Sequence, residues 1–81
     1  MHELSLAQGL ISQLTDLTEV HKATRIIAVR VNIGTRAGIV VDSFIFGFNA
    51  VKTATAFIRE AKLEITEVDG DDLILAQVVM E

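Results

Sequence analysis

Residues 25–34 read RIIAVRVNIG, a run in which β-branched side chains dominate and polar ones alternate with them toward its end. In an extended chain successive side chains point to opposite faces, so the residues of such a run divide into two sets. The apolar set is Ile27, Val29, Val31 and Ile33, and the polar set is Arg30 and Asn32. We therefore expect a strand over residues 25–33 that buries its odd-numbered face and ends at Gly34.

An amphipathic helix is expected before this strand, over about residues 3–20. Apolar side chains recur there at spacings of three and four, which places them on one helical face. Glu3 near the start and Lys22 near the end suit the charges of the helix dipole. The positions with this spacing are Leu4, Ala7, Leu10, Ile11, Leu14, Leu17 and His21.

A second helix is expected after the strand. Asp42 or Ser43 can cap its start, because both side chains accept hydrogen bonds from free main-chain N–H groups. The helix either ends near residue 53 or continues through residues 57–60. Its apolar residues at helical spacing are Phe44, Ile45, Phe48 and Val51. Phe44 and Phe48 are expected in the core rather than in a ligand-stacking platform.

Two further strands are expected, over residues 61–68 and 73–80, because apolar residues alternate in the first and dominate the second. The turn between them is Asp69-Gly70-Asp71-Asp72, and Asp-Gly between apolar runs is a strong hairpin signal. We expect these strands to pair antiparallel and the turn to be solvated, since it is too short for a calcium loop. The fold class is then an α/β two-layer sandwich, with a three-stranded mixed sheet and two helices on one face.

Composition restricts the functions that this chain can have. Its 81 residues suit one domain, and a hydrophobic fraction of 51% suffices for a core. It contains no cysteine, so disulfides, thiolate metal sites and thiol nucleophiles are excluded. A net charge of −4 and dispersed basic residues argue against binding to nucleic acid. No membrane-spanning run, signal peptide or catalytic motif is recognisable, so we expect a cytoplasmic protein that is not an enzyme.

The first residues, Met1-His2-Glu3-Leu4-Ser5, carry candidate metal ligands. The amine of Met1, the amide nitrogen of His2 and its imidazole can close adjacent chelate rings on one ion. The amide of Glu3 is next in line for a fourth position. Such a planar, nitrogen-rich set suits Ni(II) or Cu(II), and affinity should rise with pH because binding displaces protons. The alternative is that His2 is an accidental histidine on a frayed terminus.

The run from Met1 to Leu6 resembles the N-terminus of the HypA/HybF family of hydrogenase-maturation nickel metallochaperones. The strand end Val31-Asn32-Ile33-Gly34 resembles the family more weakly. The resemblance implies that His2 is the nickel ligand, with main-chain groups of Met1 and Glu3 beside it. It also implies transient nickel delivery, and as partners a nickel-handling GTPase and a hydrogenase precursor.

The resemblance also shows a departure from the family pattern. The strand Ala61-Lys62-Leu63-Glu64-Ile65 is similar to the family strand that leads into a zinc-binding domain with two Cys-x-x-Cys pairs. Here a tight turn near residues 69–72 stands in its place, so no zinc is expected. Whether this is a natural or an engineered deletion stays open.

His21 is the only other histidine, and a straight helix would place it about 28 Å from His2, so it cannot join the same site. We interpret it as a helix-end residue favoured by the dipole.

The alternative function is a metal-free interaction module that keeps the fold and binds partners through a sheet edge or helix face.

Overall fold

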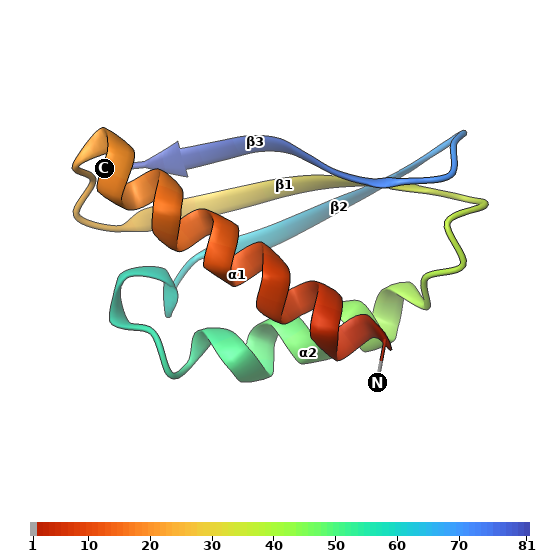
Figure 1. Cartoon of the computed structure of the whole chain (residues 1–81), viewed down its shortest axis with the longest axis horizontal. Helices are drawn as coiled ribbons and strands as arrows, with labels where there is room; N and C mark the ends of the chain where they lie inside the picture. Colours follow the sequence, from red (N-terminus) through yellow and green to blue (C-terminus); the bar gives the residue numbers. More distant parts are fainter. Residues whose placement is uncertain (1) are drawn as a thin grey trace.

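The computed structural model describes residues 2–81 and shows two helices packed on one face of a three-stranded sheet (Figure 1). This is the predicted two-layer α/β sandwich, with its elements in the predicted order. In chain order they are α1 (His2–His21), β1 (Ile26–Gly34), α2 (Val41–Lys52), the short 3-10 helix η1 (Ala56–Ile58), β2 (Lys62–Val68) and β3 (Leu73–Met80).

The strand predicted from residues 25–34 is the centre of the sheet, whose order is β2-β1-β3. β1 runs parallel to β2 and antiparallel to β3. The predicted pairing of β2 with β3 as a hairpin is therefore wrong, because β1 lies between them. The central position gives the most buried strand a hydrogen-bonded neighbour on each side, and this outweighs the local hairpin signal of Asp69-Gly70.

The connection from β2 to β3 crosses directly over the end of β1. The N–H of Gly34 donates to the carbonyl of Asp72 at 2.8 Å, and the N–H of Thr35 donates to the carbonyl of Val68 at 2.8 Å. A Cβ atom on Gly34 would lie 2.3 Å from the carbonyl carbon and oxygen of Gly70. Only glycine at position 34 lets the two backbones approach this closely.

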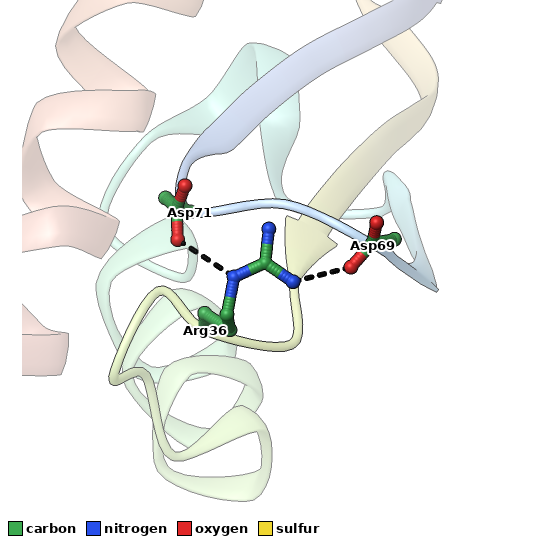
Figure 2. A network of polar contacts seen from close by, with 3 residues as sticks. All are labelled: Arg36, Asp69 and Asp71. Atoms are coloured by element: carbon green, nitrogen blue, oxygen red, sulfur yellow. Dashed lines mark hydrogen bonds and ion pairs between the residues drawn. The ribbon is translucent and has the colours of Figure 1, made fainter.

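Two of the three acidic residues of the crossing are paired with one arginine (Figure 2). Nε of Arg36 donates to Oδ1 of Asp71 at 3.0 Å, and its Nη1 donates to Oδ1 of Asp69. All three side chains are more than half exposed, so these ion pairs contribute little to stability. The turn is solvated as predicted, and its carboxylates hold Arg36 over the end of β1.

The core lies between the sheet and the helices, and one residue of β1 departs from the predicted face. Ile27 is 39% exposed, whereas Ile26 is 2% exposed. The register against β3 shifts between Ile26 and Ala28, and the extra residue reverses the alternation of side chains there. The rest of the predicted face is buried as expected: Val29, Val31 and Ile33.

The two helices pack closely on each other, and α2 begins differently from the prediction. Phe44 and Phe48 are fully buried, as expected. Gly47 brings α2 against α1, because a Cβ atom added to Gly47 would lie only 3.5 Å from the Cα of Leu4. The N-cap residue, which directly precedes α2, is Val40, and it provides no side-chain cap, so the expected capping by Asp42 or Ser43 is wrong.

α2 ends at Lys52, and the helix is interrupted before η1 although no glycine lies between the two. Two side chains hold the broken segment in place. Nζ of Lys52 donates to the carbonyl of Ala61 at 2.8 Å, and Nε of Arg59 donates to the carbonyl of Thr53 at 3.2 Å. Of the two alternatives for this helix, the structure shows the earlier end.

Candidate metal centre at the start of the first helix

Two of the three predicted ligand residues, His2 and Glu3, lie in the first turn of α1. His2 is the first residue of the helix and its side chain is exposed, while Met1 lies outside the described residues. The first four N–H groups of a helix have no acceptor within it. The amide nitrogens of His2 and Glu3 are therefore not committed to helical hydrogen bonds, and the imidazole of His2 is accessible to an ion from solvent.

The side chain of Glu3 has a structural task at this end of the molecule. Its Oε2 accepts a hydrogen bond from the N–H of Val40 at 3.3 Å, just before α2 begins. Hydrogen bonds from its own main-chain N–H and from that of Val40 hold the pKa of Glu3 below its usual value. The carboxylate thus ties the first turn of α1 to the start of α2 and partly supplies the cap that α2 lacks.

This contact predicts a pH dependence of stability. Because the pKa of Glu3 is lower in the folded than in the unfolded chain, its contribution is present above the unfolded-state pKa. It is lost as the pH falls through the folded-state pKa. Glu3→Gln should therefore lower the melting temperature at neutral pH and matter less in acid, by a small amount because the group is solvated. Glu67→Gln on β2 is the control, and an equal pH effect of both substitutions would contradict the assignment.

Side chains alone do not build a metal site at this end. Within residues 2–81, no three His, Asp or Glu side chains gather in a way that could hold an ion. His21 ends α1, twenty residues long, and lies at the end of the molecule away from the N-terminus (Figure 1). The structure therefore keeps the two histidines apart at opposite ends of α1, as predicted.

A separate cavity of about 340 Å³ lies where β1 begins. It is lined by Arg25, Ile26, Ile27, Ala56, Phe57 and Glu60. Arg25 already binds a carboxylate, because its Nη2 lies 2.5 Å from Oε2 of Glu81. The cavity contains none of the predicted metal ligands.

Comparison with known proteins places this arrangement in a family. Residues 1–72 match the family model described as "HypA: Hydrogenase/urease nickel incorporation, metallochaperone, hypA". The chain belongs to the HypA family. Neither helix among residues 2–81 has the length and apolarity needed to cross a membrane.

Individual HypA proteins resemble most of this chain. The hydrogenase maturation factor HypA of Azotobacter vinelandii is 39% identical over 70 residues, which are 86% of this chain and 61% of that protein. The one from Roseiflexus sp. (strain RS-1) is 35% identical over 68 residues, which are 84% of this chain and 54% of that protein. The chain thus spans little more than half the length of these curated relatives.

A solved structure of the family has the same fold. The solution structure of the Ni metallochaperone HypA from Helicobacter pylori superposes with a TM-score of 0.78. The superposition covers 98% of this chain and 86% of that one, at 18% sequence identity. At this identity the similarity establishes the fold alone.

The sequence suggested His2, Met1 and Glu3, but one contact at the site was missed. The bond from the Val40 N–H to Glu3 joins residues 37 positions apart, and Val40 is an apolar residue in a loop. No local pattern could have revealed it, because the donor is a main-chain group whose partner depends on how α1 and α2 pack.

Proposed function

We propose that this chain binds Ni(II) at its N-terminus and passes it on by ligand exchange, as a nickel-binding metallochaperone of the HypA type. One observation carries the proposal. In a chain of the HypA family, His2 is exposed at the first position of a helix whose next residues are anchored on α2. The anchoring presents the ligand at a constant place on the surface, and the exposure lets both ion and acceptor reach it.

The proposed ligands are the amine of Met1, the amide nitrogen and imidazole of His2, and the amide nitrogen of Glu3. Neighbouring nitrogens form small chelate rings, which favour the square-planar geometry that Ni(II) accepts. The amide of Glu3 is the weakest candidate, because its own carboxylate accepts its N–H and must release it. No side chain encloses the ion in this arrangement, so an acceptor can replace the ligands one at a time.

We further propose that the chain acts without zinc, as a single nickel-binding domain in the cytoplasm. The absence of cysteine supports this, since zinc domains of the family type need Cys-x-x-Cys pairs. The four residues 69–72, which close over β1, would replace the zinc module. The proposed partners are a hydrogenase precursor, supported by the names of the relatives, and a nickel-handling GTPase, supported by family resemblance alone.

A nickel titration tests the proposal. We expect about one Ni(II) per chain and a yellow, low-spin, square-planar spectrum that strengthens as the pH rises, because binding releases protons. Met1 should be retained, since initiator methionine is removed mainly before small residues. His2→Ala should abolish the spectrum, whereas the matched control His21→Ala should leave it nearly unchanged.

A second comparison separates the chelate from simple imidazole binding. A short N-terminal extension turns the amine of Met1 into an amide while His2 stays in place. Untagged protein should bind nickel and the extended protein should not. Equal binding by both would overturn the chelate and leave the metal-free interaction module as the better account of this chain.

A further inference from the structure

The cavity at the start of β1 is a second candidate site, separate from the metal centre. It is lined by the first residues of β1 and by the segment of η1, at the end of the molecule away from the N-terminus (Figure 1). The parallel ladder with β2 begins only at Ala28, so within residues 2–81 Ile26 and Ile27 have no strand partner on that side. With about 340 Å³, the cavity is at the lower end of the range for small-ligand sites.

Four of the six residues that line the cavity are apolar. Ile26 and Ile27 belong to β1, and Ala56 and Phe57 belong to η1. Ile27 is 39% exposed, so part of this apolar surface is in contact with solvent. An aliphatic chain in the cavity would remove that surface from water, and the face of the Phe57 ring attracts a nearby cation.

The other two lining residues, Arg25 and Glu60, are charged, and their surroundings differ. Arg25 is bound to Glu81 through its side chain, and the N–H of Glu81 also donates to the carbonyl of Arg25 at 2.9 Å. The hydrogen bond to Glu81 raises the pKa of Arg25, and the negative charge of Glu60 adds to this rise. Glu60 is exposed and forms no ion pair within residues 2–81. Its carboxylate is therefore accessible to a ligand.

We propose that this cavity binds a small aliphatic amine, whose ammonium group pairs with Glu60 and whose carbon chain lies against Ile27 and Phe57. The charges select a cation, because two carboxylates, those of Glu60 and Glu81, surround the single guanidinium of Arg25. An anion would compete with Glu81, which main-chain hydrogen bonds hold in place, and Glu60 would repel it. A cation meets neither obstacle.

A titration followed by nuclear magnetic resonance tests the ligand class. Hexylammonium chloride should cause saturable shifts of the amide signals of Ile27, Phe57 and Glu60. The dissociation constant should be about 1 mM, as is usual for so small a ligand. Hexanoate has the same chain length and the opposite charge, and should bind at least about tenfold more weakly. Equal binding of both compounds, or no saturable shift at the cavity, would overturn the proposal.

Two substitutions test the position of the ligand. Glu60→Gln should weaken hexylammonium binding by about fivefold or more, because the ion pair is lost. Glu67→Gln removes the same charge from β2 outside the cavity and should leave binding unchanged. Ala56→Phe should block binding, because Ala56 is exposed and a larger side chain there fills the cavity. Binding as tight as that of the parent in Glu60→Gln or Ala56→Phe would contradict the site.

A lysine side chain of another protein carries the same alkylammonium chemistry as a free amine. A short peptide with one lysine between glycines, titrated beside hexylammonium, separates the two sources. Tighter binding of the peptide would assign the site to a partner's lysine, and tighter binding of hexylammonium to a free amine; both results support the proposal. Nickel binding by Glu60→Gln should equal that of the parent, so this cavity and the nickel site can fail separately.

Discussion

Phe48→Ala is expected to lower the free energy of unfolding by about 3–5 kcal/mol, a large share of what so small a domain possesses. Phe48 is fully buried between α2 and the sheet, and truncation both removes apolar contacts and leaves a cavity that the packed neighbours cannot fill. Denaturant unfolding followed by circular dichroism measures the change.

Phe46 is a control for Phe48 on the same helix. It is the same residue type two positions earlier, but its side chain is 74% exposed. Phe46→Ala should change the free energy of unfolding by no more than about 0.5 kcal/mol, as is usual for surface positions. Losses of similar size for both substitutions would mean that the burial of α2 is assigned to the wrong face.

Gly34→Ala should destabilise the chain by about 3 kcal/mol or more. Overpacking a core usually costs about 1–3 kcal/mol, and here the added methyl group meets main-chain atoms rather than a side chain that can turn away. Its nearest atoms would be the carbonyl of Gly70 at 2.3 Å and the nitrogen of Asp71 at 2.7 Å. Hydrogen bonds from Gly34 and Thr35 hold the crossing segment against β1, so it cannot retreat without breaking them.

Two other glycines serve as controls for Gly34. Gly70→Ala adds a methyl group to the other backbone of the same crossing, where the nearest atom, the Cα of Gly34, is 4.0 Å away, and should be tolerated. Gly9→Ala lies within α1 with nothing within 4 Å, and should raise the free energy of unfolding by about 0.5–1 kcal/mol. If Gly34→Ala behaves like either control in thermal unfolding, the close crossing is wrong.

The sequence alone determined the elements of this fold. The spacing of apolar residues predicted α1 to within one residue at each end, and β3 within its observed bounds, Leu73–Met80. It also placed Phe44 and Phe48 in the core, where both are fully buried. These predictions succeed because the periodicity of side-chain burial is a local property, which depends on the residues of one element and on which side faces the core.

The candidate metal site was predicted in the same local way. His2 stands beside the free amine by its position in the chain, and the short run around it suggested the family to which the chain belongs. The structure adds that His2 begins α1 and is exposed. Nickel ligation by Met1, His2 and Glu3 remains a prediction, and the titration above tests it.

Only the tertiary structure decided how the elements meet. Asp69-Gly70 signalled a hairpin, yet β1 lies between β2 and β3, because the choice of strand neighbours depends on which strand gains most from a central position. Ile27 turned outward because one extra residue in a strand reverses its faces. The bond from Val40 to Glu3 and the contact of Gly34 with Gly70 join residues more than 30 positions apart. Such contacts leave no local pattern, since each partner is chosen by the packing of the whole chain.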